Sequence, residues 1–505
     1  MIGLDGASPD LIFRLAHKGI LPTIKGIMTD GSYGKLKSTI PPVTCPAWVS
    51  SSTGVNIGKH GIHDFSLSVD LRKKNVVFAD STKRQVDAIW NLLTAAGKRV
   101  VVLNFPVTYP PERVNGAMVS GMLTPSTKSN FTFPRSLKDE LLDLGYVIDV
   151  ADTMLDEILA FKADEFGMLS RIRKVTNSRL IAAQYLMKEF EWDLFMVVFV
   201  ALDRIQHQFW RYIDSSHIAY DAEKAKTMYP QILKCYEQID KAVNSLMKIA
   251  GKNTNVIIYS DHGFKPLNKT FFTNSLLRSM GLLKLRGNRP ARLLPTREMH
   301  LKKMVQLRIE RIMGKLTPGL KRKVGGLLQP SKEFLDIFDV EPDETKAFQF
   351  GYSSIEVNRN LVSDEEEYEK TRGAIVNTLN ERLFSATSIR AYRKEELYHG
   401  PALGDLPAVT LLSEKDVTPR QLVPASNLLT LNYDETSDIP SLMWNGDHDL
   451  FGTILMTGPK IPMGLPLKGV NIMDVAPTIL HLMKVPVPSH MDGRAVQEDL
   501  PKHNF

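Results

Sequence analysis

A buried apolar run that ends abruptly in two metal-type ligands constrains the fold of this chain more than any other feature. Residues 256–259 (Val-Ile-Ile-Tyr) are apolar and mostly β-branched, which predicts a buried strand. Asp261 and His262 follow almost directly, and Gly263 then frees the backbone to turn. Open α/β sheets place their chemistry at the carboxyl ends of such strands. The pattern therefore favours an α/β sheet with a site at this edge.

Further oxygen and nitrogen donors stand next to other apolar runs. They are Asp5 after residues 1–4, Asp203 after residues 194–202, His207, and His448 before residues 452–456. Asp203 and His207 are four residues apart, so they share a face if the segment is helical. Any one of these residues could be a helix cap or a hydrogen-bonded core residue. Together they indicate a metal site built from strand ends.

Thr44 is the candidate nucleophile. It stands between Pro42 and Pro46, just before a helix-like stretch that ends at Thr53 and Gly54. A hydroxyl at a helix N-terminus lies in a positive field beside free backbone N–H groups, which suits an anionic phosphoryl group. The alternative is that Thr44 merely caps that helix.

These motifs resemble the alkaline phosphatase superfamily, and within it the type I phosphodiesterase/nucleotide pyrophosphatase branch with its prokaryotic phosphohydrolase and phosphomutase relatives. The resemblance covers nearly the whole chain in the family's order. It rests on Gly3-Leu4-Asp5-Gly6, Pro42-Val43-Thr44-Cys45-Pro46, Asp203-Arg204-Ile205-Gln206-His207, Ser260-Asp261-His262-Gly263 and Gly446-Asp447-His448. It implies an alkaline-phosphatase-like doubly wound α/β sheet with a helical cap insertion.

Carried over by position, the resemblance also implies two divalent metal sites. One would use Asp5, Thr44, Asp261 and His262, and the other Asp203, His207 and His448. The mixture of imidazole and carboxylate favours Zn²⁺, with Mn²⁺ as the second choice. The expected reaction is metal-dependent hydrolysis of a phosphodiester or pyrophosphate in a small phosphorylated substrate, through a phospho-Thr44 intermediate.

The sequence departs from the family at the position of a phosphate-holding Asn, which falls by spacing at Phe65. Four residues could substitute for it: Lys59, His60, His63 and Asn104. Cys45 invites comparison with sulfatases, which convert a Cys in a C-x-P-x-R motif. The chain lacks that Arg, and Thr44 occupies the nucleophile position, so sulfatase activity is not expected.

Other functions remain as alternatives to a phosphodiesterase. A phosphomonoesterase or phosphomutase of the same superfamily would use a similar ligand set, although the related mutases use Ser where this chain has Thr44. A non-catalytic protein that binds anionic ligands or a membrane surface is an alternative of another class. The net charge of +7 suggests nucleic-acid binding as a further alternative. The basic residues lack interleaved aromatics, however, so no specific nucleic acid is expected.

A chain of 505 residues exceeds one typical core. We expect a catalytic core formed by residues 1–280 and 346–505, interrupted by a basic helical cap insertion at residues 281–345. Within it, residues 285–328 combine apolar residues at helical spacing with many Lys and Arg, as in helices that contact anionic membranes. A solvated cap is the alternative. Two cysteines, Cys45 and Cys235, give no disulfide framework, so we expect a cytoplasmic protein with membrane-surface association as an option.

Overall fold

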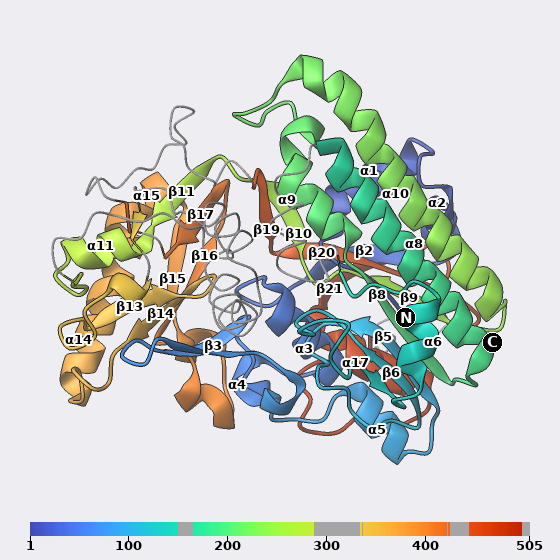
Figure 1. The fold of residues 1–505 in the computed structure, drawn as a ribbon, viewed down its shortest axis with the longest axis horizontal. Coiled ribbons are helices and arrows are strands. Elements are labelled where there is room, and N and C mark those ends of the chain that lie inside the picture. The colour runs from blue at the N-terminus through green and yellow to red at the C-terminus, as the bar shows by residue number, and fades with distance from the viewer. Residues whose placement is uncertain (150–164, 287–333, 336, 422, 425–443, 497–505) are drawn as a thin grey trace, which may run out of the picture.

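A nine-stranded mixed sheet forms the centre of the fold (Figure 1). The computed structural model describes residues 1–149, 165–286, 334–335, 337–421, 423–424 and 444–496. From edge to edge, the strands are β21 (Pro466–Asn471), β2 (Ser32–Lys37), β20 (Phe451–Thr457), β9 (Val256–Tyr259), β1 (Ile2–Leu4), β8 (Leu194–Phe199), β5 (Val100–Phe105), β6 (Gly116–Ser120) and β7 (Thr132–Phe133). The middle strands from β9 to β6 run parallel, whereas β20 and β7 run antiparallel to their neighbours.

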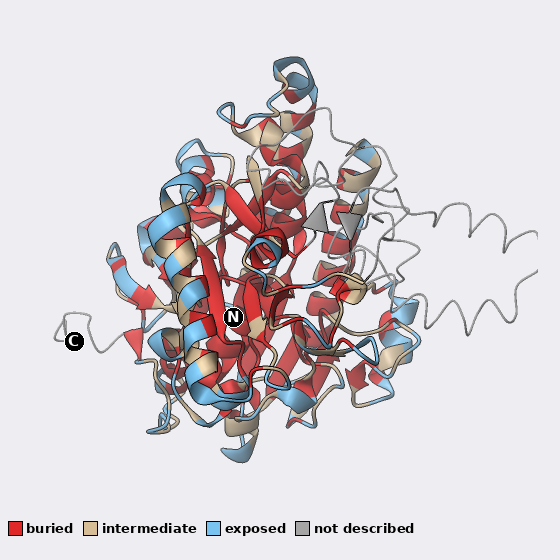
Figure 2. Cartoon of the chain, turned by 90° about the vertical axis from the view of Figure 1, so that its left-hand side faces the viewer, coloured by how far each residue is buried: buried red, intermediate tan, exposed pale blue. Residues whose placement is uncertain are grey.

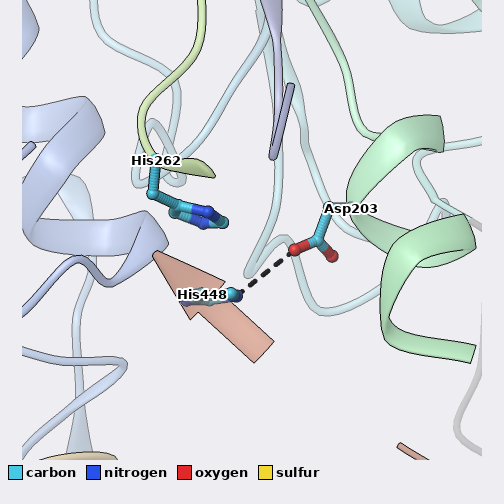
Figure 3. Close-up of side chains that lie close together, drawn as sticks. All are labelled: Asp203, His262 and His448. Atoms are coloured by element: carbon cyan, nitrogen blue, oxygen red, sulfur yellow. Dashed lines mark ion pairs between the residues drawn. The ribbon is translucent and has the colours of Figure 1, made fainter. Parts of the chain in front are cut away.

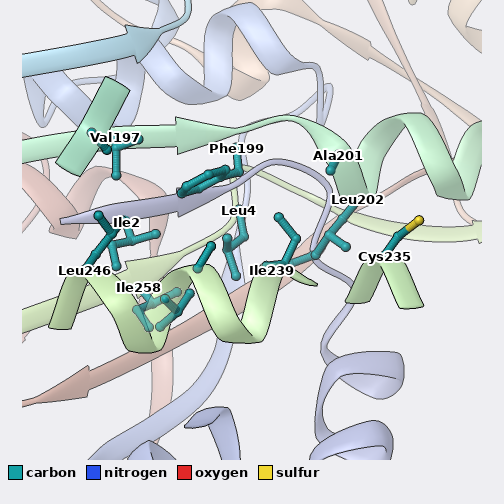
Figure 4. Close-up of a cluster of buried hydrophobic side chains, with 14 of the residues drawn as sticks. Ile2, Leu4, Val197, Phe199, Ala201, Leu202, Cys235, Ile239, Leu246 and Ile258 are labelled. Atoms are coloured by element: carbon teal, nitrogen blue, oxygen red, sulfur yellow. The ribbon is translucent and has the colours of Figure 1, made fainter. Parts of the chain in front are cut away.

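Both faces of this sheet are covered by helices, because its central strands are apolar on both sides. In β8, Val197 and Phe199 belong to one apolar cluster, while Met196 and Val198 belong to another. The first cluster is completed by α1 (Pro9–His17), α2 (Pro22–Asp30), α8 (Glu165–Glu189), α9 (Ala201–Ile213) and α10 (Ala222–Ala250). Figure 4 shows part of it. The second is completed by α3 (Thr44–Thr53), α5 (Ile89–Ala95) and α17 (Val475–Leu482). The predicted α/β sheet is confirmed.

The carboxyl ends of β1, β8 and β9 lie side by side. In the parallel register Leu4 is opposite Phe199, and Gly3 is opposite Tyr259. The apolar run at residues 194–202 is not one continuous strand, since β8 ends at Phe199 and α9 begins at Ala201. Asp203 therefore lies in the first turn of α9 rather than at a strand end, because the chain turns into a helix as it leaves the sheet.

A second unit has its own sheet and apolar cluster, and Figure 1 shows it beside the large sheet. Its strands, in spatial order, are β13 (Ala347–Phe350), β14 (Ser354–Val357), β16 (Val409–Ser413) and β15 (Ile389–Arg393). Its helices include α11 (Thr273–Ser279), α14 (Glu365–Asn377), α15 (Phe384–Thr387) and α16 (Lys394–Leu397). These strands fall within the span predicted as the second part of the core, and they pair with one another because their apolar residues form a separate cluster.

Short ladders join the two units. Two of them matter for the site: β10 (Gly263–Pro266) with β19 (Gly446–Asp449), and β11 (Lys269–Phe272) with β17 (Val417–Arg420). The remaining elements include β3 (Ser66–Asp70), β4 (Asn75–Phe78), β12 (Phe334–Leu335), β18 (Val423–Pro424), α4 (Ile57–His60) and α6 (Leu137–Asp143).

The predicted basic segment at residues 285–328 falls outside the described residues from position 287 onward, as does most of the predicted insertion at 281–345. In the parts of the chain that are described, no helix is long and apolar enough to cross a membrane. Figure 2 shows buried residues filling the sheet, with exposed residues on the outward faces of the helices.

Candidate metal centre

The predicted ligands come together at the carboxyl ends of β1 and β9 and the start of α9. Two groups of buried side chains each place their ligand atoms within 4.8 Å of one another: Asp5, Asp261 and His262 in one, and Asp203, His262 and His448 in the other. Figure 3 shows the second group, which comes from three separate elements. His262 belongs to both, so the two groups form one continuous cluster.

Thr44 lies at the first group. His262 Nε2 is 3.1 Å from Asp261 Oδ2 and 3.7 Å from Asp5 Oδ1. The Thr44 hydroxyl is 3.3 Å from the same Nε2. All four side chains are buried. The structure thus brings together the set that the resemblance assigns to one metal.

His207 adjoins the second group, and with Asp203 and His448 it forms the set that the resemblance assigns to the other metal. Asp203 Oδ1 is 3.3 Å from His207 Nε2 and 3.4 Å from His448 Nε2. The two Nε2 atoms are 3.1 Å apart. Asp203 and His207 occupy one face of α9, as their spacing predicts. His448 arrives from β19, in register with Phe264 of β10.

Backbone carbonyls fix the three imidazoles so that Nε2 faces the centre. The Nδ1 atoms of His207, His448 and His262 lie 2.9, 2.9 and 3.1 Å from the carbonyl oxygens of Gly446, Pro42 and Gly263. A carbonyl can only accept, so each Nδ1 must donate. Burial lowers the pKa of His262 well below its usual range and that of His448 to about 4. The His262 and His448 rings are therefore neutral, with an Nε2 lone pair available to a metal.

In each carboxylate, one oxygen accepts a hydrogen bond, and the other accepts none from the described residues. Asp5 Oδ2 accepts from Trp48 Nε1 at 3.2 Å, Asp203 Oδ2 from Arg204 at 2.6 Å, and Asp261 Oδ1 from the Gly6 N–H at 3.1 Å. The opposite oxygens, Asp5 Oδ1, Asp203 Oδ1 and Asp261 Oδ2, are buried and lack a hydrogen-bond partner in the described part of the chain. These are the atoms that face the imidazoles, so the donors present fit divalent cations.

The negative charge of the buried carboxylates also favours bound cations. Burial, followed by the negative charges of Asp261 and Asp203, raises the pKa of Asp5 well above its usual range. Burial and the charge of Asp203 likewise raise the pKa of Asp261. Buried carboxylates are costly unless a cation offsets them. A cation at the unpartnered oxygens would offset this cost.

Two glycines in the predicted motifs allow close approach of the backbone. Gly6 has a φ of +72°, a region that favours glycine, and a Cβ there would lie 2.6 Å from the Phe264 ring. A Cβ on Gly263 would lie 2.1 Å from the Phe451 carbonyl oxygen. The Gly residues that flank Asp5 and His262 are therefore required by packing around the site.

Thr44 is the first residue of α3, and Val43 occupies the N-cap position without a side-chain cap. The structure thus does not show the capping role considered for Thr44. Cys45, the next residue, is buried in a small apolar cluster, and burial raises the pKa of its thiol well above the usual range. Cys45 is therefore a core residue rather than a reactive thiol.

The candidates for the missing Asn position are mostly engaged elsewhere. Lys59 Nζ pairs with Asp492, and His60 Nε2 lies 2.8 Å from the Ser50 hydroxyl. The Asn104 amide donates to the Val198 carbonyl at 3.1 Å. His63 is buried, and no described residue bonds to its Nδ1. Phe65 packs against apolar clusters.

Several residues at the site carry no sequence signal that predicts them. The Tyr352 ring stacks on His448, with centroids 5.3 Å apart and an angle of 15° between the planes, and its hydroxyl bonds to Asp447. The Tyr352 N–H donates to the buried Asp64 carboxylate at 2.6 Å. Trp444 lies against the His207 ring, with centroids 3.9 Å apart. Both aromatic rings lie far from their histidine partners in sequence.

Arg204 connects the second group to the rest of the core. Its guanidinium lies 2.6 Å from Asp203 Oδ2 and 2.6 Å from Asp149 Oδ2, and its side chain is only 9% exposed. Burial alone would lower the pKa of Arg204, but the charges of Asp149 and Asp203 raise it. Arg204 therefore stays charged and holds one oxygen of Asp203 away from the centre.

Arg204→Gln should lower the free energy of unfolding by about 3 kcal/mol, because it leaves two carboxylates without their buried counter-charge. Urea denaturation of the metal-loaded protein measures this loss. Arg99→Gln is the matched control, since Arg99 pairs with Asp193 and Glu191 at an exposed position, and it should leave the midpoint nearly unchanged. Equal midpoints for both variants would contradict the role given to Arg204.

Comparison with known proteins adds to this geometry. The family model for type I phosphodiesterase/nucleotide pyrophosphatase matches residues 1–390. No curated protein matched the chain. Among solved structures, human ectonucleotide pyrophosphatase/phosphodiesterase 5 is similar, with 14% sequence identity, a TM-score of 0.53 and 98% of each chain covered.

Another similar structure is phosphonoacetate hydrolase from Sinorhizobium meliloti in complex with phosphonoacetate. It shows 14% identity and a TM-score of 0.54, with 94% of this chain and 93% of that chain covered. The murine ectonucleotide pyrophosphatase/phosphodiesterase 5, in an inactive form with AMP, has 13% identity and a TM-score of 0.50, with 98% of each chain covered. At these identities the likeness shows the fold, and it confirms the predicted alkaline-phosphatase-like architecture.

Proposed function

The chain belongs to the type I phosphodiesterase/nucleotide pyrophosphatase family and is a phosphoric ester hydrolase, and from this premise we propose that it cleaves a phosphodiester or pyrophosphate through a phospho-Thr44 intermediate. One observation carries the proposal. Three buried carboxylate oxygens without a partner among the described residues and three imidazole Nε2 atoms converge in one cluster, and the Thr44 hydroxyl lies beside its His262. Buried polar atoms in a purely structural core are normally hydrogen-bonded, so this arrangement favours bound cations.

Asp5, Thr44, Asp261 and His262 would hold one divalent cation, and Asp203, His207 and His448 the other. The two imidazole-carboxylate sets favour Zn²⁺ over Mn²⁺. When bound, such cations offset the negative charge that develops on the phosphoryl oxygens and lower the pKa of a nearby hydroxyl.

The chain's own residues supply the nucleophile and its orientation. Thr44 Oγ1 would form a bond to phosphorus as the bond to the leaving oxygen breaks, and water would later break the Thr44–phosphorus bond. The N-terminus of α3 favours the phosphoryl anion beside Thr44, because its free N–H groups carry partial positive charge. Gly446, Pro42 and Gly263 hold the imidazoles in place through their carbonyls.

The proposed substrate is a small phosphorylated compound. One similar structure holds AMP and another phosphonoacetate, which supports a site for compact anions. A phosphomonoesterase or phosphomutase is the second candidate, because the same ligands would serve a monoester. A protein that only binds anions without turnover is the third.

Steady-state rates on bis-p-nitrophenyl phosphate and p-nitrophenyl phosphate separate these candidates. Metal-free protein would be assayed before and after Zn²⁺ or Mn²⁺ is added back. We expect kcat/KM to be higher for the diester and to depend on the added cation. A preference for the monoester would favour the second candidate, and no turnover of either ester with full metal content would leave only binding.

A further inference from the structure

Arg420 is the last residue of β17. Among the described residues, no ion pair or hydrogen bond involves its side chain, although the side chain is partly buried. Other buried arginines behave differently, since Arg84 pairs with Glu112 and Arg372 pairs with Glu369 and Glu395. A guanidinium that is partly withdrawn from water, with no counter-charge among the described residues, would be stabilised by a bound anion.

The guanidinium remains charged in this position. Burial lowers the pKa of Arg420 to about 10, which is still well above neutral pH. Its fork of N–H donors suits carboxylate and phosphate oxygens. The side chain is therefore a permanent cation with unused hydrogen-bond donors.

Arg420 lies one aromatic ring away from the candidate metal centre. Its Cζ is 5.4 Å from the centre of the Trp444 ring, a cation–π contact that fixes the guanidinium. The Trp444 ring in turn lies 3.9 Å from the His207 ring, at an angle of 30°. The Trp444 ring thus lies between Arg420 and His207. A substrate group bound by Arg420 would be about one side chain away from a group bound beside His207.

The same strand face carries a second unused polar group. Thr418 and Arg420 are two residues apart on β17, so their side chains point to the same face. The Thr418 hydroxyl is buried and has no hydrogen-bond partner among the residues that the structure describes. The Arg420 guanidinium and this hydroxyl therefore share one strand face, and both could bond to an anionic ligand.

We propose that Arg420 binds a second anionic group of the substrate, a carboxylate or phosphate remote from the phosphorus that is attacked. The substrate class is then a phosphodiester or pyrophosphate that carries an additional negative charge on one of its two esterifying groups. The inference rests on the proposed function, because it assigns specificity to the same site.

Two diesters with the same leaving group test the proposal: 4-carboxyphenyl 4-nitrophenyl phosphate and phenyl 4-nitrophenyl phosphate. Wild-type protein should show the higher kcat/KM on the carboxylated diester. Arg420→Gln should lower that preference about tenfold, the loss of one charge-assisted contact, while sparing the uncharged diester. Arg420→Lys should keep part of the preference. An unchanged preference in Arg420→Gln would overturn the proposal.

Two controls exclude a structural explanation. Arg359→Gln removes the same charge from an arginine that is already paired with Glu365, so it should leave the preference unchanged. Arg420→Gln should also melt at the wild-type temperature or above, because it removes an unpaired buried charge. A clear fall in its melting temperature, with equal losses on both diesters, would show that Arg420 only supports the fold.

A binding measurement separates this inference from the proposed function. In a Thr44→Ala background with metal present, calorimetry would compare 4-carboxyphenyl phosphate with phenyl phosphate. A tighter Kd for the carboxylated probe that is lost with Arg420→Gln supports the anion site even if neither diester is cleaved, in which case the proposed function alone fails. Diester cleavage without any Arg420-dependent preference in Kd or kcat/KM overturns the anion site alone.

Discussion

Thr44→Ala is expected to lower kcat on a metal-supplemented diester by roughly a thousandfold or more, because the phosphoryl group loses the oxygen that would accept it. Metal content should fall little, since the other ligands of its group remain. Thr44→Ser should retain part of the activity, because it keeps a hydroxyl at the N-terminus of α3. Rates on bis-p-nitrophenyl phosphate, and mass spectrometry of the acid-quenched peptide that contains residue 44, measure these effects.

The matched control for this series is the adjacent Cys45→Ala. Cys45 is fully buried among apolar side chains, so its replacement should cost some stability but leave most of the activity. The opposite result, with turnover abolished by Cys45→Ala and preserved in Thr44→Ala, would reject Thr44 as the nucleophile.

Removing a ligand from either group should empty one metal site and lower kcat/KM by about a hundredfold or more. His448→Ala tests the group around Asp203, and Asp261→Asn tests the group around Thr44. Metal analysis should show about one equivalent lost per chain in each variant. A full metal complement in His448→Ala would contradict the assignment of that group.

Asp261→Asn should have opposite effects on stability once metal is removed and on metal binding. Asp5, Asp203 and Asp261 crowd negative charge into a buried cluster, so Asp261→Asn should stabilise the chelated protein while it weakens metal binding. The amide can still accept from the Gly6 N–H through its oxygen. Asp10→Asn, at an exposed pair with Lys35, should change neither property. A chelated Asp261→Asn protein less stable than chelated wild type would argue against charge crowding at the centre.

The second unit illustrates a limit of prediction from local pattern. From sequence, residues 346–505 are expected to continue the catalytic core, because a local pattern does not show which sheet a strand joins. The side chains of strands β13 to β16 form a separate cluster, and the chain returns to the large sheet only with β20. Pairing between distant strands depends on packing that no short window of sequence contains.

The sequence by itself identified the candidate ligands and most of their placement. Apolar runs that end in Asp5 and Asp261 must present those side chains at a sheet edge, and the spacing of Asp203 and His207 must place both on one helix face, because strand and helix periods are local properties of the backbone. What only the tertiary structure decided is how these groups are oriented. The carbonyl that fixes His448 belongs to Pro42, and the ring stacked on it belongs to Tyr352. Arg420 contacts the Trp444 ring, which lies against the His207 ring. Such contacts join segments that meet only when the two units pack together, so their chemistry follows from the folded core.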